Sequence, residues 1–154
     1  MLAEPRKAVD EASEKIGHRL KILVAKPGLD GHSNGAEQIA VRAKDVGMEV
    51  VYQGIRLTPE EIAASAVQED VDVVGLSILS GSHRELVPRV VELLRSEGAE
   101  IPVVVGGIIP AADAAAMREA GVDGVYTPKD FEINRIMGEI AELVADRHRA
   151  AQPA

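Results

Sequence analysis

The sequence predicts an α/β protein with a doubly wound, five-stranded parallel sheet. Five short apolar runs alternate along the chain with five segments of helical periodicity, and strands that alternate with helices form parallel sheets through right-handed crossovers. Aromatic residues make up only 2% of the sequence. The core therefore has to be built from Val, Ile, Leu and Ala, as in a parallel sheet covered by helices on both faces.

The expected domain spans residues 20–148, and residues 149–154 form a loose tail. Residues 1–19 form a charged arm that is rich in Ala and Glu and weakly helical in pattern. Two interpretations of this arm stay open. It is either disordered, because polar termini usually are unless packing holds them, or it is a docking segment for another subunit.

The five expected strands span residues 21–25, 49–52, 71–77, 102–106 and 124–126. After the first strand, apolar residues recur at helical spacing over residues 36–46, and Gly47 ends that helix. After the second strand, the segment Thr58-Pro59-Glu60-Glu61 is a capping box with proline at the first helical position. These signals predict the first two helices.

The remaining three helices follow the last three strands. Ser82 begins a second candidate capping box, although Pro88 predicts a later start or a bend in that helix. Residues 110–120 form a short Ala-rich helix that Gly121 ends. Asp130 caps the last helix, whose apolar stripe is Ile133, Ile136, Met137, Ile140, Leu143 and Val144.

Composition excludes several classes of function. The formal net charge of −8 argues against non-specific binding to nucleic acid or to anionic membranes. The chain has no cysteine, which excludes disulfides and thiolate metal sites. No apolar stretch is long enough to span a membrane and no signal-peptide core precedes the domain, so we expect a cytoplasmic protein.

The loop after the first strand carries the most informative residues. Asp30 and His32 lie on a glycine-rich segment, where Asp30 can accept the proton of one ring nitrogen and leave the other nitrogen for a metal. Lys26 can modulate the charge of that carboxylate. A single histidine cannot build a zinc site, which takes three or four protein ligands. A metal at His32 would therefore take most of its ligands from another source, such as a macrocycle.

Small residues follow the third and fourth strands, at the edge of the sheet where ligands bind. Ser77 and Ser80 can donate hydrogen bonds to a ligand, whereas Gly81, Gly106 and Gly107 let the backbone approach a bulky one. An ordinary strand-to-helix turn remains the alternative for Gly106-Gly107. Phosphate binding is disfavoured because neither G-x-G-x-x-G nor G-x-x-x-x-G-K-[ST] is present.

Together these loops resemble the cobalamin-binding domain of adenosylcobalamin-dependent mutases. That family carries D-x-H-x-x-G, then S-x-L, then G-G, and the matching residues here are Asp30, His32, Gly35, Ser77, Leu79, Gly106 and Gly107. The resemblance covers about residues 20–145. It implies a flavodoxin-like (Rossmann-like) cobalamin-binding fold.

Within that family, the sequence is similar to acyl-CoA mutases of the methylmalonyl-CoA mutase type. Residues 26–32, 75–81 and 105–110 carry this likeness. Residues 33–38 and 126–131 depart from the usual methylmalonyl version and instead resemble the ethylmalonyl-CoA mutase branch.

The resemblance implies adenosylcobalamin (vitamin B12) as the cofactor, bound base-off/His-on. His32 would replace dimethylbenzimidazole as the lower axial ligand to cobalt, oriented by Asp30 and Lys26. The displaced nucleotide tail would enter a slot between the sheet and a helix. The cofactor-binding residues so implied are Lys26, Asp30, Gly31, His32, Ser33, Asn34, Gly35, Ser77, Leu79, Ser80, Gly81, Gly106, Gly107, Tyr126, Thr127 and Pro128, with no catalytic residue on this chain beyond the cobalt ligand.

The resemblance also implies partners. The family's substrate site lies in a separate (β/α)8 barrel, which takes about 250 residues and cannot fit in this chain. The chain is then either the small subunit of a two-component isomerase, inactive alone, or a domain excised from a larger enzyme, and its start methionine and arm favour the small subunit. The implied partners are a large acyl-CoA mutase subunit and a G-protein chaperone.

Three other functions share parts of this pattern. A corrinoid carrier for methyl transfer has the same histidine signature, but such carriers place a helical bundle ahead of the cobalamin domain. A two-component receiver domain needs an aspartate at the end of the third strand, where this chain has Ser77. A carrier of FMN needs flanking aromatic residues, which are missing.

Overall fold

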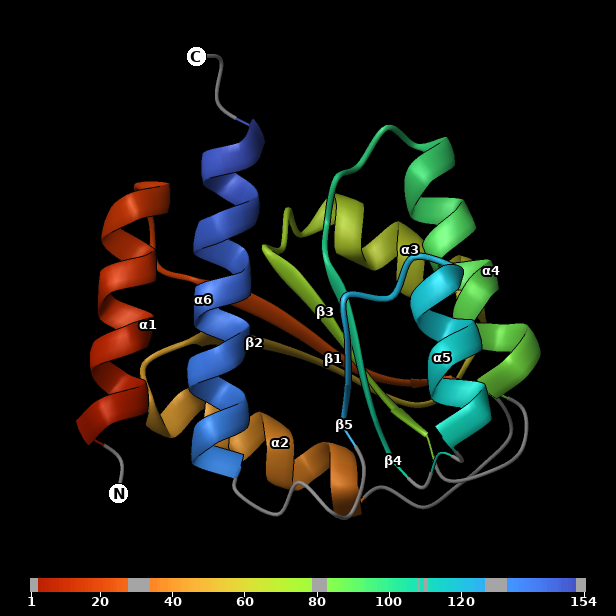
Figure 1. The fold of residues 1–154 in the computed structure, drawn as a ribbon, viewed down its shortest axis with the longest axis horizontal. Helices are drawn as coiled ribbons and strands as arrows, with labels where there is room; N and C mark the ends of the chain where they lie inside the picture. Colours follow the sequence, from red (N-terminus) through yellow and green to blue (C-terminus); the bar gives the residue numbers. More distant parts are fainter. Residues whose placement is uncertain are drawn as a thin grey trace.

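The computed structural model describes residues 3–27, 34–78, 83–107, 109, 111–126 and 133–151. Five strands form one parallel sheet in the order β2-β1-β3-β4-β5 (Figure 1). The strands are β1 (Lys21–Pro27), β2 (Glu49–Leu57), β3 (Val73–Ile78), β4 (Val103–Gly107) and β5 (Gly124–Tyr126). This topology confirms the doubly wound parallel fold.

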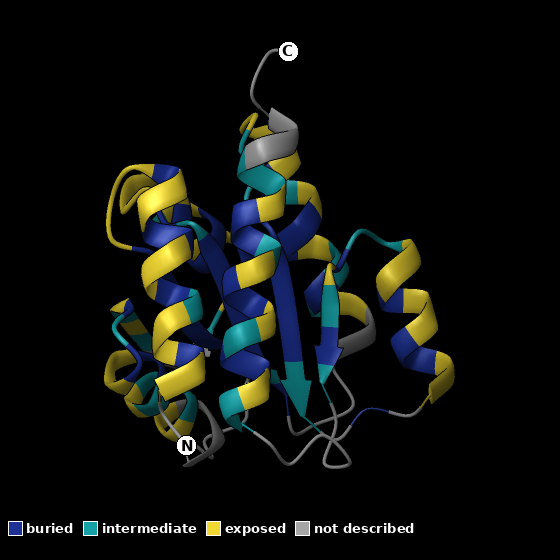
Figure 2. Cartoon of the chain, turned by 60° about the vertical axis from the view of Figure 1, so that its left-hand side comes forward, coloured by how far each residue is buried: buried dark blue, intermediate teal, exposed yellow. Residues whose placement is uncertain are grey.

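Helices cover both faces of the sheet (Figure 1). Helices α1 (Ala3–Ile16), α2 (Asn34–Asp45) and α6 (Ile133–Ala151) lie on one face, which we call the α2/α6 face. Helices α3 (Pro59–Gln68), α4 (His83–Ser96) and α5 (Ala111–Glu119) lie on the other face. Figure 2 shows the buried strands between helices whose outer surfaces are exposed.

The alternation of side chains along each strand divides the core into two apolar clusters. On β1, Leu23 and Ala25 belong to the cluster under α3, α4 and α5. Ile22 and Val24 belong to the cluster under α1, α2 and α6. Because successive strand residues point to opposite faces, residues two apart in each strand share one cluster.

Strand β2 and helix α4 depart most clearly from their expected extents. Strand β2 continues to Leu57 rather than ending at residue 52, and its pairing with β1 is irregular at Gly54. Gly54 lies within this edge strand, where a glycine tolerates an irregular register. Helix α4 starts at His83 and runs through Pro88, so the expected later start is wrong, although Pro88 cannot donate the helical hydrogen bond to the carbonyl of residue 84.

The start of α3 confirms the predicted capping box. The side chain of Thr58 accepts a hydrogen bond of 3.1 Å from the backbone nitrogen of Glu61, and the carboxylate of Glu61 accepts one of 3.1 Å from the backbone nitrogen of Thr58. Two amide groups that the helix leaves without partners are thereby satisfied.

Helix α1 packs against α6, and its residues Val9 and Ala12 are buried. The division into an arm, a domain and a tail stays a prediction, as does docking of another subunit by this segment. Over the described ranges, no helix is both long and apolar enough to cross a membrane.

Candidate cofactor-binding cavity

A cavity of about 390 Å³ lies between the α2/α6 face of the sheet and the two helices α2 and α6. Pockets that bind small molecules typically have volumes of roughly 300–1,000 Å³. The lining side chains are mostly aliphatic. They come from four strands and both helices, and include Ile22, Val24, Gly75, Ser77, Val104, Gly106, Gly107, Tyr126, Gln38, Ile39, Ile133, Ile136, Met137 and Ile140.

The cavity exists because small residues recur on this face of the sheet. Strand pairing places Val24, Gly75, Val104 and Gly124 in one row across four strands. The row nearer the carboxyl ends runs from Ser77 through Gly106 to Tyr126. In both rows, glycine stands where a side chain would otherwise fill the space under the helices.

The surroundings of Gly75 and Gly106 show that this space is open. A Cβ atom at Gly75 would lie 3.5 Å from Cδ1 of Ile22 and 3.9 Å from Cγ2 of Val104, which are ordinary contacts. A Cβ atom at Gly106 would lie 3.9 Å from the nearest atom, the carbonyl oxygen of Tyr126. Larger side chains at either position would therefore project into the cavity rather than into packed atoms.

Tyr126 forms the wall of the cavity on the side of β5. Its ring lies over Gly124, because a Cβ atom at position 124 would come within 3.3 Å of Cε2 and 3.4 Å of the hydroxyl oxygen. Gly124 thus leaves room for a ring that folds back along its own strand. The half-buried Tyr126 contributes an aromatic surface and a hydroxyl group to a wall that is otherwise aliphatic.

Lys26 lies near the carboxyl end of β1 and is only 1% exposed. Because side chains alternate along β1, Lys26 lies on the same face of the sheet as Ile22 and Val24, which line the cavity. A buried ammonium group requires compensation by polar or acidic groups. Lys26 therefore places a basic side chain at the end of the strand from which residues 28–33 continue.

The structure brings four of the predicted site residues together around this cavity: Ser77, Gly106, Gly107 and Tyr126. Asn34 and Gly35 begin helix α2. The other predicted residues lie outside the described residues, and their roles stay predictions; they are Asp30, Gly31, His32, Ser33, Leu79, Ser80, Gly81, Thr127 and Pro128. Among the side chains that the structure describes, no group of three or more His, Asp or Glu residues is placed to hold a metal ion.

Sequence reasoning missed two glycines and the function of one helix face. Gly75 and Gly124 precede Ser77 and Tyr126 by two residues, so strand alternation places them on the same face as the predicted site. The apolar stripe of α6 was predicted as a feature of the last helix, with no role in the site. Its residues Ile133, Ile136, Met137 and Ile140 also line the cavity.

Comparison with known proteins relates the chain to cobalamin-binding domains. The family described as B12 binding domain matches residues 20–132. In solved structures, a cobalamin-binding protein from Desulfitobacterium hafniense superimposes with a TM-score of 0.69 and 22% identity, over 82% of this chain and 59% of that one. At this identity, the superposition shows the fold alone.

Two curated relatives are acyl-CoA mutases. Ethylmalonyl-CoA mutase of Cereibacter sphaeroides is 58% identical over 147 residues, which are 96% of this chain and 22% of that enzyme. The 2-hydroxyisobutanoyl-CoA mutase small subunit of Aquincola tertiaricarbonis is 43% identical over 83% of this chain and 94% of that subunit. The chain thus spans about a fifth of the ethylmalonyl-CoA mutase and nearly all of the small subunit.

Proposed function

Because the chain belongs to the family of B12 binding domains, we propose that it holds adenosylcobalamin base-off, with His32 as the axial ligand to cobalt. The nucleotide tail of the cofactor would lie in the cavity between the sheet and helices α2 and α6. The observation that carries this proposal is the cavity itself, which opens where glycines replace larger side chains at positions 75 and 106.

The residues of the cavity suit a nucleotide tail. Aliphatic side chains from α6 and the strand backbone at Gly75 and Gly106, where no side chain intervenes, can sandwich a flat heterocycle. Ser77 is half-buried at the cavity and offers a hydroxyl group, and the hydroxyl of Tyr126 offers another. A largely apolar pocket with a few polar groups that fix orientation is the usual form of a small-molecule site.

The proposed roles of the residues near the cobalt follow from their chemistry. His32 would supply the ligating nitrogen, and Asp30 would accept the proton of the other ring nitrogen and fix the orientation of the imidazole. The buried Lys26 would hold the carboxylate of Asp30 ionised by its positive charge. When bound, the cofactor supplies homolysis of its cobalt–carbon bond, and the protein supplies ligation and positioning.

We further propose that the chain acts as the cobalamin-binding component of an acyl-CoA mutase. The relatives named as acyl-CoA mutases support this function over a corrinoid carrier for methyl transfer. The likeness to a small subunit over 94% of its length supports a two-component arrangement. The partner would be a large subunit with a (β/α)8 barrel that binds the acyl-CoA, and a G-protein chaperone would assist cofactor loading.

Cobalamin titration tests the site. The wild-type chain should take up cobalamin and give the absorption spectrum of histidine ligation. His32→Ala should abolish that spectrum without loss of the circular dichroism of the fold. His18→Ala is the matched control, because His18 lies before the start of β1, at the opposite end of the strand. No corrinoid uptake by the wild type, or an unchanged spectrum in His32→Ala, would contradict the proposal.

Reconstitution tests the activity. The chain is mixed with adenosylcobalamin and with a large acyl-CoA mutase subunit encoded beside it. Isomerisation of an acyl-CoA should appear only when both chains are present. Turnover of methylcobalamin with a methyl donor, in the absence of any isomerisation, would instead favour the corrinoid carrier.

A further inference from the structure

Helix α1 contacts both helices that wall the cavity. Near its start, the guanidinium of Arg6 donates a hydrogen bond of 2.7 Å to the carbonyl oxygen of Asp45, the last residue of α2. Along its length, α1 packs beside α6 (Figure 1). One helix thereby links the two walls, α2 and α6.

The face of α1 toward α6 is apolar and buried. Val9, Ala12 and Ile16 are 0%, 2% and 9% exposed, and their spacing gives one stripe along the helix. They belong to the same apolar cluster as Ile140 and Met137 of α6, which also line the cavity. The packing of α1 is therefore continuous with the wall of the cavity.

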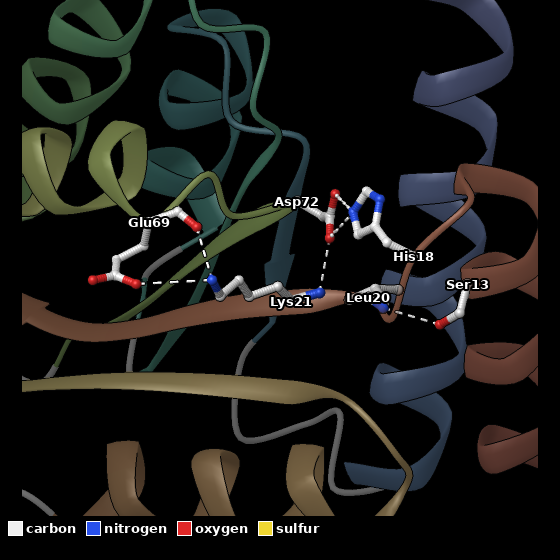
Figure 3. Close-up of polar contacts among 6 residues, drawn as sticks. All are labelled: Ser13, His18, Leu20, Lys21, Glu69 and Asp72. Atoms are coloured by element: carbon white, nitrogen blue, oxygen red, sulfur yellow. Dashed lines mark hydrogen bonds and ion pairs between the residues drawn. The ribbon is translucent and has the colours of Figure 1, made fainter.

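The other end of α1 is attached to the sheet. The hydroxyl of Ser13 accepts a hydrogen bond of 3.0 Å from the backbone nitrogen of Leu20. Next to it, the carboxylate of Asp72 accepts hydrogen bonds of 2.8 Å from the backbone nitrogen of Lys21 and from Nε2 of His18 (Figure 3). These contacts fix the turn between α1 and β1, so that α1 is held at α2, at α6 and at the sheet.

An apolar cavity needs such support. The atoms that line it forgo the dispersion contacts that close packing would give, and α2 and α6 would regain those contacts by closing onto the sheet. One described hydrogen bond joins α2 directly to α6, from Arg42 to Asn134, and it is long at 3.3 Å. A shorter hydrogen bond, of 2.7 Å, joins α1 to α2, and α1 also packs along α6.

We propose that α1 is a brace that holds the cavity open in a shape ready for the nucleotide tail of the cofactor. This inference rests on the proposed function. A site held in its bound shape gains affinity because binding does not have to order it. The family match covers residues 20–132, and both α1 and α6 lie outside those residues.

The test compares two corrinoids. Cobalamin carries the nucleotide tail, whereas cobinamide lacks it, so the ratio of their affinities reports on the cavity. Val9→Ala, which removes packing of α1, should lower the affinity for cobalamin by about tenfold, or 1.4 kcal/mol of binding free energy. The affinity for cobinamide should change by less than about twofold, since its binding does not use the cavity.

Val90→Ala is the matched control. Val90 lies on α4, belongs to the cluster on the other face of the sheet and is 0% exposed, as is Val9. The two variants should lose comparable stability, but Val90→Ala should leave the affinity ratio of cobalamin to cobinamide unchanged. This comparison separates bracing of the cavity from a general loosening of the core.

Two surface variants test the brace independently, so that the test does not depend on the folding of Val9→Ala. Arg6→Gln removes the link from α1 to α2 without disturbing the core, and Lys7→Gln makes the same change of charge at the neighbouring exposed position. Only Arg6→Gln should lower the affinity ratio, and by less than Val9→Ala.

The outcomes distinguish the two proposals. If Val9→Ala and Val90→Ala change the ratio equally, or if Arg6→Gln and Lys7→Gln do, the brace is overturned although cobalamin still binds. If the wild type takes up neither corrinoid, the proposed function itself fails.

Discussion

The carbonyl group of Ile78 occupies the space into which a side chain at position 107 would project. Ile78 pairs with Gly107 across β3 and β4, and a Cβ atom built on Gly107 would overlap the carbonyl oxygen of Ile78. The φ angle of Gly107 is +150°, in the region that favours glycine. The backbone at the carboxyl end of β4 therefore requires glycine whether or not a ligand is bound.

We predict that Gly107→Ala lowers the free energy of unfolding by at least about 2 kcal/mol, because the strand must move and the backbone conformation is strained. Urea denaturation of the protein without cofactor measures this loss. The control is Gly106→Ala, where a Cβ atom has 3.9 Å of clearance and the change should stay within about 1 kcal/mol. Equal losses in the two variants would show that the pairing with Ile78 is not the cause.

Asp72 should matter more to stability than its partner His18. The side chain of Asp72 is 14% exposed and accepts a backbone hydrogen bond from Lys21, whereas the side chain of His18 is 54% exposed. Asp72→Ala leaves the amide of Lys21 without its acceptor and should cost about 1–3 kcal/mol. His18→Ala removes a mostly solvated pair and should cost less than about 1 kcal/mol.

A double-mutant cycle in urea checks this order. The coupling between Asp72 and His18 should be small beside the full effect of Asp72→Ala. A coupling as large as that effect would mean that the ion pair, rather than the backbone hydrogen bond, carries the stability.

The phenol of Tyr52 has a raised pKa, because desolvation disfavours the phenolate and the carboxylate of Glu37 repels it. An unfolded tyrosine titrates at a pKa of about 10. Since the folded state favours the neutral phenol, the resulting stability is present below that pH and is lost as the pH rises through the folded pKa. The free energy of unfolding should therefore fall more steeply above pH 10 in the wild type than in Tyr52→Phe.

Ultraviolet absorbance of the phenolate measures this pKa directly. The chain has two tyrosines, so Tyr126→Phe isolates the signal of Tyr52. Glu37→Gln should lower the pKa of Tyr52 only part of the way, because desolvation is the larger cause. Complete return to the ordinary value would assign the whole shift to the charge of Glu37.

The sequence was sufficient for features that depend on local or periodic patterns. The capping box at Thr58 is a contact between residues three apart, and the five-stranded parallel sheet follows from alternating strands and helices. Ser77 and Gly106 were predicted at one site because parallel strands end at a common edge, and the family resemblance added Tyr126 to them. Their common row in the sheet shows that they do lie together.

The features that sequence reasoning missed depend on contacts between distant segments. An isolated glycine such as Gly75 gives no sign of the space above it until α6 is in place. The apolar positions Val9 and Ala12 show a helical spacing, but only the structure shows that α6 covers them. Strand β2 extends past its expected end at residue 52 because β1 pairs with it there, at Gly54 and Leu57.

Gly75 gives the sharpest test of where the nucleotide tail lies, because stability and binding should move in opposite directions. Its backbone lies in a regular strand, and a Cβ atom would make only ordinary contacts of 3.5 Å or more. Gly75→Ala should therefore raise the free energy of unfolding by about 0.5–1 kcal/mol, since alanine loses less backbone freedom on folding than glycine. The same methyl group would project into the cavity.

The affinity for cobalamin should fall in Gly75→Ala and fall further in Gly75→Val, by about tenfold or more, as 1.4 kcal/mol of lost contact would produce. Cobinamide should bind each variant as it binds the wild type, because it has no tail to displace. Leu94→Ala serves as the control, since Leu94 lies on α4 and belongs to the cluster on the opposite face; it should lose stability and keep the ratio of the two affinities. Unchanged cobalamin binding in a stable Gly75→Val would mean that the tail lies elsewhere than in this cavity.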